Sequence, residues 1–387
     1  MSTEGFVISI VVAYIKKVYY MENINYGLEG VVVNTTAISY IDGIGGQLVY
    51  RGYNIEELTN LNYEQVVYLL MYGNIPDAAQ TADFMERLAS VRQIPNYLIN
   101  IMKEMPKETE VIDAVRTTVS ALNLHGMSAE DTAIQLISKL PVITAMIYNV
   151  LNNKSLVSPK ESLSHSANFL YMLHGGKEAD PLIVNALDKY LITTADHGMN
   201  ASTFTARVVS STESDMVSAI VAAIGALKGP LHGGAPSEVE AMLNEIGTIK
   251  NIEPWLLEQI HGGKRIMGFG HRVYKTYDPR SMLLREAVKA MGSKFGNLAL
   301  SLALEEKAVE LLETHKPGRN LYPNVEFWAA AILRVIDLPH NLYTPTFGIG
   351  RVSGWCIQVM EQMSANRLIR PSVKYTGVIP PKYTYSK

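Results

Sequence analysis

Residues 268–280 read Gly-Phe-Gly-His-Arg-Val-Tyr-Lys-Thr-Tyr-Asp-Pro-Arg, and they give the first indication of the fold, a helical body whose loops carry the chemistry. The glycines allow the backbone to approach a ligand closely while the imidazole of His271 acts on it. Asp278-Pro279 fixes the turn that presents Arg280. Helical spacing of the apolar residues that follow predicts a helix containing Met282, Leu283, Ala287 and Val288. The first amides of that helix would face an anion.

Three further histidines lie in glycine turns, in Ala195-Asp-His197-Gly, Gly229-Pro-Leu-His232-Gly-Gly and His261-Gly-Gly. A single histidine in such a turn is more often a hydrogen-bonded structural residue, but several in one chain favour a functional site. No pair has the short ligand spacing of a closed zinc site, and the chain has no His-Glu-x-x-His. We therefore expect no metal.

Candidate anion-binding and acidic groups lie in the last third of the chain. Arg351, in Phe-Gly-Ile-Gly-Arg, and Arg370, in Leu-Ile-Arg-Pro, have apolar neighbours, so each either pairs with a buried carboxylate or binds an anionic ligand. Arg280 has the alternative of being a surface cation. Asn324 is a predicted N-cap that places Glu326 in the first turn of a helix, and spacing alone slightly favours an acid that complements the helix dipole.

The rest of the chain has the capping residues and apolar periodicity that are typical of helices. Asn62 and Gln65 form a capping-box pattern before an apolar run that ends near Gly73. Two more helices are predicted from apolar periodicity, one with Phe84, Leu88 and Val91, the other with Leu300, Leu304, Ala308 and Leu311. The segment 215–228 is apolar or small on nearly every face, which is typical of a helix buried on all sides in a subunit interface or central core.

Strand signals are confined to the beginning of the chain. Gly30-Val-Val-Val, Ala37-Ile-Ser-Tyr-Ile and Gln47-Leu-Val-Tyr are predicted strands, with a hairpin turn at Asp42-Gly43. The fold class is therefore all-α with a small N-terminal β-hairpin. The stretch from Gly229 to Asn324 is rich in Gly, Pro and His, so it is a candidate second domain.

Composition narrows the classes of protein. A hydrophobic share of 48% with only 18% charged residues suits an all-α protein or an oligomer that hides much of its surface. Lys and Arg (34) nearly balance Asp and Glu (37), so binding to nucleic acid or to a membrane surface is not expected. The single cysteine, Cys356, is expected to be a packing residue and fits a reducing, cytoplasmic location. Residues 1–20 are interpreted as an N-terminal extension with Met21 as an alternative start, because ten apolar residues followed by lysines match neither a signal peptide nor a membrane span.

As a set, these residues resemble the citrate synthase family, from about Gly27 to about Gly377. The matching motifs are Gly27-Leu-Glu-Gly, Ile41-Asp-Gly, Tyr50-Arg-Gly-Tyr-Asn-Ile-Glu, Ala195-Asp-His-Gly-Met-Asn-Ala-Ser-Thr-Phe, Gly229-Pro-Leu-His-Gly-Gly-Ala and the stretch 268–280. The last two, in this order and at this separation, are highly specific.

The resemblance implies an all-α, two-domain helical homodimer with 21–228 and 333–387 in a large domain and 229–332 in a small domain that carries active-site loops. It implies an acyltransferase of the citrate (Si)-synthase type, the enzyme of the tricarboxylic acid cycle that condenses acetyl-CoA with oxaloacetate and hydrolyses citryl-CoA to citrate and CoA. Acetyl-CoA is a substrate, and no cofactor is expected.

The resemblance also implies roles for individual residues. Glu326 is the expected base, His232 the neutral imidazole that donates to the thioester oxygen, and His271 the group that polarises and protonates the ketone. The expected carboxylate receptors are His197, Arg280, Arg351 and Arg370, the last from the neighbouring subunit. The loop of Arg265, Ile266, Met267 and Gly268 is expected to lie beside CoA.

The chain departs from the family pattern at the base. The family usually has Asp in Tyr-Pro-Asn-Val-Asp-Phe-Tyr-Ser-Gly, where this chain has Tyr-Pro-Asn-Val-Glu326-Phe-Trp-Ala-Ala. One extra methylene advances the carboxylate by about 1 Å, a misplacement that can cost about 100-fold in rate. The usual Arg-Pro-Arg is Arg370-Pro-Ser372. Two alternatives to citrate synthase therefore stay open: a 2-methylcitrate synthase that prefers propionyl-CoA, and a weakly catalytic protein that binds oxaloacetate and CoA.

Overall fold

The computed structural model describes residues 24–233, 235–271, 273–292 and 298–381 and divides the chain into two units. The smaller unit consists of the terminal segments 1–35 and 369–387. Its described part contains the short 3-10 helix η1 (Tyr26–Leu28). The strand predicted at 30–33 is wrong, since Val31 to Val33 have no regular structure and Val32 is 87% exposed. The predicted extension 1–20 lies outside the described residues.

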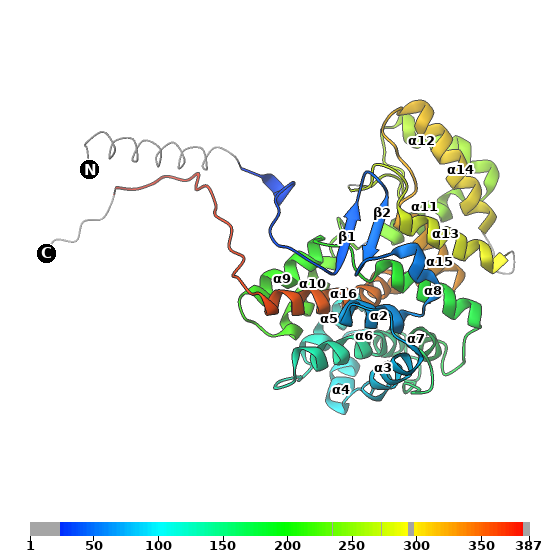
Figure 1. Ribbon diagram of the computed structural model, residues 1–387. Coiled ribbons are helices and arrows are strands. Elements are labelled where there is room, and N and C mark those ends of the chain that lie inside the picture. Colours follow the sequence, from blue (N-terminus) through cyan, green and yellow to red (C-terminus); the bar gives the residue numbers. More distant parts are fainter. Residues whose placement is uncertain (1–23, 234, 272, 293–297, 382–387) are drawn as a thin grey trace, which may run out of the picture. The chain divides into compact units, whose positions relative to one another are not determined.

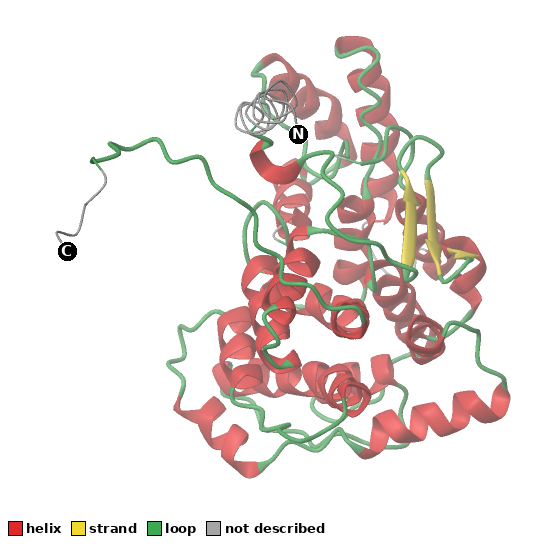
Figure 2. Ribbon diagram, turned by 60° about the vertical axis from the view of Figure 1, so that its left-hand side comes forward, coloured by secondary structure: helices red, strands yellow, loops and turns green. Residues whose placement is uncertain are grey.

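The larger unit, 36–368, is helical, as Figures 1 and 2 show. Its α-helices are α2 (Tyr63–Tyr72), α3 (Ala78–Ser90), α4 (Asn96–Glu104), α5 (Val111–Ser120), α6 (Ala129–Leu151), α7 (His165–Leu173), α8 (Pro181–Thr194), α9 (Ala201–Ser211), α10 (Met216–Leu227), α11 (Ala235–Ile246), α12 (Ile252–His261), α13 (Pro279–Met291), α14 (Leu298–His315), α15 (Val325–Val335) and α16 (Tyr343–Ser364). Short 3-10 helices are η2 (Ile55–Asn60), η3 (Ile249–Asn251) and η5 (His340–Leu342). The all-α prediction is confirmed.

A small antiparallel sheet lies at the start of the larger unit, in the order β1 (Ser39–Asp42), β2 (Gln47–Tyr50) and β3 (Tyr53–Asn54). The β1–β2 connection begins at the predicted position but spans four residues, with Asp42 paired to Gln47. The Asp42 carboxylate accepts hydrogen bonds from the amides of Ile44 and Gly45 at 2.9 and 2.8 Å, which shapes this loop. The sheet thus has one strand more than the predicted hairpin.

Several local predictions are confirmed at the level of hydrogen bonds. The Asn62 side chain accepts from the amide of Gln65, and Gln65 returns a bond to the amide of Asn62, which completes the capping box of α2. Gly73 ends that helix in the left-handed conformation. The predicted apolar face of α14 is buried, from Leu300 to Leu311. These ends fix the helices on which the larger unit is built.

The long helix α16 is the buried centre of the unit and contacts α6, α8, α9 and α10. Its glycines allow this packing, because a Cβ at Gly350 would overlap the hydroxyl of Thr194 and one at Gly354 would overlap the carbonyl oxygen of Ala195. The backbone of α16 therefore lies directly against the end of α8. This approach brings Arg351, which lies between the two glycines, beside the loop of His197.

The helix α6 is long and apolar enough to cross a membrane by length and composition, but 89% of its apolar window is buried inside the fold. Cys356, on α16, is fully buried, so the predicted packing role is confirmed. In contrast, α10 is buried on one face only, with Val217, Val221 and Gly225 left partly exposed in the single chain. The division of the helical body into domains at 229 and 332 stays a prediction.

Candidate active site

Six of the predicted site residues lie close together in the larger unit, most of them in loops or first turns of helices and Arg351 in the middle of α16. The structure brings together His197, His232, His271, Arg280, Glu326 and Arg351. These residues are close enough for their charges to shift one another's pKa values. The positive charge of Arg351 acts on the pKa of His197, His232 and Glu326. The positive charge of Arg280 acts on the pKa of His197, His271 and Glu326. Residues separated by up to 154 positions, His197 and Arg351, therefore belong to one site.

The loop before α13 fixes His271 in one tautomer. Its Nδ1 accepts the backbone N–H groups of Val273 and Tyr274, each at 3.0 Å. A nitrogen that accepts cannot carry the proton, so the neutral ring has its proton on Nε2. Burial and the guanidinium of Arg280, whose NH2 group lies 3.4 Å from Nε2, lower the pKa of His271 to about 4. With its proton on Nε2, His271 is a neutral donor; Arg280 is also only a donor, so this N–H does not bond to Arg280 and is left for an acceptor on a ligand.

Next to this loop lies His197, whose Nε2 is 3.3 Å from the hydroxyl of Tyr274. The rings of His197 and His271 meet edge to face at 5.8 Å. Burial, together with the positive charges of Arg280 and Arg351, holds the pKa of His197 well below its usual range. Neutral histidines beside two arginines leave this part of the site positively charged, as an anionic ligand requires.

The opposite tautomer is imposed on His232. The backbone N–H of Ser202, in the first turn of α9, donates to Nε2 of His232 at 3.3 Å, and the Ser202 hydroxyl lies 2.7 Å from the same atom. Because the amide can only donate, Nε2 is the acceptor and the proton is on Nδ1. Burial lowers the pKa of His232 to about 4, with a smaller effect from Arg351. The neutral ring therefore presents Nδ1–H as its free donor.

Glu326 is the acidic group of the site, and Asn324 places it. The Asn324 side chain accepts the amide of Glu326 at 3.0 Å, which confirms the predicted N-cap of α15. Burial raises the pKa of the Glu326 carboxyl to about 7, against the opposing positive charges of Arg280 and Arg351. A carboxyl with this pKa exchanges protons near neutrality, unlike an acid that only complements a helix dipole.

Both arginines are buried, so neither is a surface cation. Arg351 is 2% exposed, donates from Nε to the carbonyl oxygen of Thr194 at 2.5 Å and lies 4.9 Å from the Phe347 ring centre. Arg280 is 3% exposed and pairs with the Asp278 carboxylate through Nε at 3.0 Å and NH2 at 2.8 Å. Each guanidinium is thus held in a fixed orientation by protein contacts.

Behind Glu326, Trp328 connects α15 to two other helices. Its indole N–H donates to one carboxylate oxygen of Glu305 on α14 at 3.2 Å, and the other oxygen accepts from Nε of Arg285 on α13 at 2.6 Å. Trp328 is fully buried. The residue that departs from the family pattern next to the base therefore makes specific polar contacts.

The predicted CoA loop lies against the base-bearing helix. Gly268 has φ of +80°, and a Cβ there would lie 2.9 Å from Cβ of Phe327, so both conformation and space require glycine. Its carbonyl oxygen accepts the amide of Asn324 at 2.9 Å. Within the same loop Arg265 is exposed, Ile266 is buried and Met267 is half-buried. The role of this loop in binding CoA stays a prediction.

The structure does not test the role of Arg370, and His261 is not one of the six residues that lie together. Arg370 is exposed and belongs to the smaller unit, so its role stays a prediction. His261 lies at the end of α12, where its ring is 5.5 Å from that of His315 at the end of α14. Within the described ranges, no cluster of three or more His, Cys, Asp or Glu side chains is arranged to hold a metal ion.

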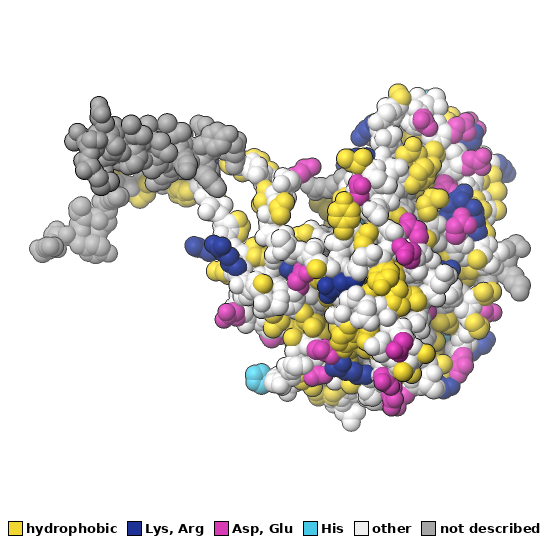
Figure 3. All heavy atoms as spheres, in the orientation of Figure 1, with side chains coloured by type: hydrophobic (Ala, Val, Ile, Leu, Met, Phe, Trp, Pro, Cys, Tyr) yellow, Lys and Arg dark blue, Asp and Glu magenta, His cyan; other side chains and the backbone are white. Residues whose placement is uncertain are grey.

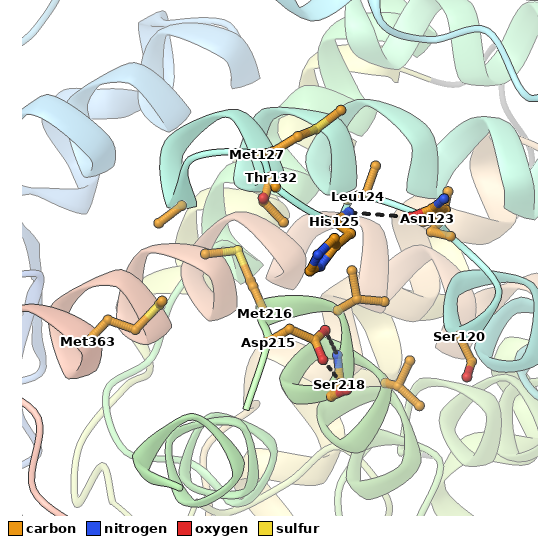
Figure 4. Close-up of a pocket in the computed structure, with 15 residues that line it drawn as sticks. Ser120, Asn123, Leu124, His125, Met127, Thr132, Asp215, Met216, Ser218 and Met363 are labelled. Carbon is orange, nitrogen blue, oxygen red and sulfur yellow. Dashed lines mark hydrogen bonds between the residues drawn. The ribbon is translucent and has the colours of Figure 1, made fainter. Parts of the chain in front are cut away.

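A cavity of about 530 Å³ lies away from these residues, between the α5–α6 connection and the start of α10 (Figure 4). Figure 4 shows His125, Met216 and Asp215 around it, and the Asp215 carboxylate is hydrogen bonded to Ser218 of its own helix at 2.9 and 2.7 Å. None of the predicted site residues lines it. On the face seen in Figure 3, basic and acidic side chains are interspersed.

Sequence reasoning missed four residues that orient the site: Ser202, Tyr274, Asp278 and Trp355. Ser202 and Tyr274 lie inside the quoted motifs, but nothing in a one-dimensional pattern says that a hydroxyl or an amide faces a ring 30 positions away. Trp355 donates to the Ser202 hydroxyl from α16, a contact across 153 positions that carries no local signal. The Asp278-Pro279 pattern predicted a turn at Asp278, but it did not indicate that the Asp278 carboxylate pairs with Arg280.

Comparisons with known proteins give a consistent result. A family model described as "Citrate synthase, C-terminal domain" matches residues 27–372. The citrate synthase of Deinococcus radiodurans is 39% identical over 373 residues, with 94% of this chain and 98% of that protein covered. A protein of Bacillus subtilis named citrate/2-methylcitrate synthase is 37% identical, with 92% and 96% covered.

Among solved structures, the chain is similar to the ternary complex of carboxymethyl coenzyme A and oxaloacetate with citrate synthase from Thermoplasma acidophilum. The TM-score is 0.84 at 32% sequence identity, with 94% of this chain and 98% of that chain covered. The similarity therefore extends over nearly the whole of both chains.

Proposed function

The chain belongs to the citrate synthase family, and from that premise we propose that it condenses acetyl-CoA with oxaloacetate and hydrolyses citryl-CoA to citrate and CoA. The observation that carries the proposal is a neutral His232 with its proton on Nδ1, a neutral His271 with its proton on Nε2, and Glu326 with a pKa of about 7 in the same site. The condensation needs one base and two donors of this kind.

The first step removes a proton from the methyl group of acetyl-CoA. That methyl is a very weak acid, so the developing enol oxygen must be stabilised while the base acts. Glu326 is the proposed base and the Nδ1–H of His232 the proposed donor to the thioester oxygen. A neutral donor stabilises the enol without placing a full charge in a buried site.

The second step forms the carbon–carbon bond. The enol carbon attacks the ketone carbon of oxaloacetate, and the ketone oxygen takes the proton from Nε2 of His271. Because two backbone amides occupy Nδ1, the imidazolate left by this transfer takes its proton back at Nε2, from the water whose hydroxide then attacks the citryl thioester. Glu326, which carries the methyl proton, gives that proton to the departing CoA thiolate. Water afterwards cleaves the citryl thioester, which releases citrate and CoA.

Arg280 and Arg351, with His197, are the proposed receptors for the two carboxylates of oxaloacetate. Both guanidinium groups are buried, and the charge of Arg280 acts on Arg351, so the repulsion between them favours binding of a dianion. Arg370 is proposed to complete the receptor from the second subunit. The loop 265–268 is proposed to lie beside CoA.

We propose a homodimer, and α10 supports it. Its partly exposed small and apolar residues recur at helical spacing, at Val217, Val221 and Gly225, and form a stripe that a second copy would cover. Light scattering after gel filtration should give twice the mass of 42.8 kDa. Gly225→Arg, which places a charged side chain on this stripe, should give monomers. The control Lys154→Arg, at an exposed position outside the stripe, should leave the dimer intact.

We propose that the reaction needs no metal and no organic cofactor, since side chains of the site can supply the base and the two donors. Dialysis against EDTA should therefore leave the rate unchanged. A reducing, cytoplasmic location likewise stays a prediction from the single cysteine.

The experiment that tests the proposal mixes acetyl-CoA and oxaloacetate with the protein and follows free CoA with a thiol reagent. Release that requires both substrates is expected. Glu326→Gln, which keeps the shape but cannot accept the methyl proton, should lower kcat by about 100-fold or more. No release at high enzyme concentration would exclude citrate synthase activity and favour the weakly catalytic binding protein.

A second candidate is 2-methylcitrate synthase, because the chain is 37% identical to a relative named citrate/2-methylcitrate synthase. The two acyl groups differ by one methylene, which pockets discriminate by only about 10- to 200-fold. The ratio of kcat/KM for acetyl-CoA and propionyl-CoA decides between the two functions.

A further inference from the structure

The Asp278 carboxylate connects two functional groups that lie 46 positions apart in the sequence. One oxygen accepts Nε and the backbone amide of Arg280, each at 3.0 Å, and the other accepts NH2 of Arg280 at 2.8 Å. This second oxygen also accepts the amide of Val325, the first residue of α15, at 3.2 Å. Asp278 thus holds Arg280 from one side and the first turn of the Glu326 helix from the other.

Burial makes these contacts strong. Asp278 is 1% exposed and Arg280 is 3% exposed, so water does not compete for the carboxylate. The amide of Val325 is one of the helix-start N–H groups that lack a partner inside their own helix. A negatively charged acceptor at this end also complements the dipole of α15. The position of Glu326 therefore depends on where Asp278 lies.

Asp278 is not placed to act on a substrate itself, because each of its carboxylate oxygens already accepts two hydrogen bonds, from Arg280 and from the first amide of α15. We propose that Asp278 is a positioning residue that couples the oxaloacetate receptor Arg280 to the base Glu326. Through this one carboxylate, Arg280 and the start of α15 hold each other in place, so the receptor for the oxo acid and the base keep a set position relative to each other. The inference rests on the proposed function.

The charge of Asp278 supports this role. It opposes the effect of Arg280 on both Glu326 and His271, and so raises the pKa of each. The other charged or titratable groups that act on Glu326 are Arg280, Arg351 on α16, and Tyr190 on α8, whose own pKa the Glu326 charge raises. Removing the Asp278 charge would leave Arg280 without its counter-ion and lower the pKa of Glu326.

The test compares Asp278→Asn with Glu305→Gln, because Glu305 also anchors α15, through Trp328, yet is not among the groups that shift the pKa of Glu326. For Asp278→Asn we expect the acid limb of kcat against pH to move to lower pH and the Kd for oxaloacetate to rise about 10-fold or more. Glu305→Gln should leave both unchanged. A limb that stays in place in Asp278→Asn, or moves equally in both variants, would overturn the inference.

A second pair of variants tests the α15 contact alone and avoids disturbing Arg280. Val325→Pro removes the amide that donates to Asp278, and proline is tolerated at the first position of a helix. Asn324 already has the extended backbone (φ −95°, ψ 179°) that a following proline requires. Val325→Ala shortens the same buried side chain but keeps the amide.

For Val325→Pro we expect kcat to fall about 10-fold or more relative to Val325→Ala, with an unchanged Kd for oxaloacetate. Equal kcat in the two variants would overturn the inference. Oxaloacetate affinity is measured by titration calorimetry, which needs no turnover. If the unmodified protein releases no CoA, the proposed function fails. The coupling to Arg280 is then tested by oxaloacetate binding alone, by comparing the Kd for oxaloacetate of Asp278→Asn with that of Glu305→Gln.

Discussion

The indole N–H of Trp355 donates to the hydroxyl of Ser202 at 3.0 Å, and the same hydroxyl lies 2.7 Å from Nε2 of His232. Since α16 supplies Trp355 and α9 supplies Ser202, the packing of two helices holds the amide and the hydroxyl of Ser202 against Nε2 of His232, and the amide makes this nitrogen the acceptor. The donor that the proposed mechanism aims at the thioester is therefore set by buried residues of the helical core.

Ser202→Ala should lower kcat by about 10- to 100-fold, because His232 loses a contact that orients its ring and Trp355 loses its acceptor. The KM for oxaloacetate should change little, since the oxo acid is bound by other groups. Ser210→Ala is the matched control. The Ser210 hydroxyl is buried on the same helix without a partner in the structure, so its removal should leave kcat unchanged.

The rate should depend on pH through Glu326. Burial raises the pKa of this carboxyl to about 7, and a base must be deprotonated to act, so kcat should rise with pH through a limb near 7. The imidazoles of His232 and His271, with pKa values of about 4, are neutral on both sides of this limb. A rate that stays constant from pH 6 to 8 would contradict the assignment of Glu326 as the base.

Glu326→Asp should lower kcat, by about 100-fold, although it restores the residue usual in the family. Shortening the side chain withdraws the carboxylate by about 1 Å, and we expect the Trp328 that accompanies glutamate here, held by Glu305, to reflect packing adapted to the longer acid. A strong rise in kcat would show instead that the native site is compromised. Adding Trp328→Tyr to Glu326→Asp should recover part of the lost rate if the two positions are matched.

Arg351→Lys should raise the KM for oxaloacetate by about 10- to 100-fold. Lysine keeps the charge but cannot both donate to Thr194, as Nε of Arg351 does, and present a planar pair of donors to a carboxylate. Arg207→Lys serves as the control, because Arg207 is also buried but is paired with Glu361 on α16 at 2.9 Å. It should affect thermal stability and leave KM unchanged.

A fifth prediction concerns stability. Asp188 on α8 is buried beside Ser166, whose hydroxyl it accepts at 2.5 Å, and beside Glu64. Burial, reinforced by the Glu64 charge, raises the pKa of Asp188 well above its usual range. The folded state thus binds a proton that the unfolded state releases, so stability is greatest at low pH and decreases as pH rises through the raised pKa.

Asp188→Asn removes this dependence because the amide oxygen still accepts from Ser166 and never ionises. The difference in melting temperature between pH 6 and pH 9 should therefore be smaller in Asp188→Asn than in the unmodified protein. Asp180→Asn, at the exposed N-cap of the same helix, should not change that difference, since asparagine caps as well as aspartate.

The sequence predicted what is local. The capping box of Asn62 and Gln65, the N-cap Asn324 and the helix that contains Met282 to Val288 are all confirmed, because each depends on contacts within a few residues. The strand predicted at 30–33 failed because β propensity has no effect without a neighbouring strand and burial. The prediction that α10 is buried on all sides does not hold within one chain, since its outer face is partly exposed there.

The site was predictable only in part. The motifs supplied the reactive side chains, because those residues lie in short glycine-rich turns. The groups that orient these side chains could not be predicted, since the Ser202–Trp355 and Asp278–Val325 contacts join positions far apart in the sequence. Protonation states were equally inaccessible, as they depend on burial and on which backbone amides face a ring nitrogen.

The two amides that point at Nδ1 of His271 have a further meaning for behaviour in acid. A doubly protonated ring has no lone pair to offer those amides, so it cannot form inside the loop as it is folded. Charging this histidine therefore requires both amide contacts to break first. Loss of activity in acid would then include a local rearrangement around the ring, and its recovery after neutralisation would require the two amides to find Nδ1 again.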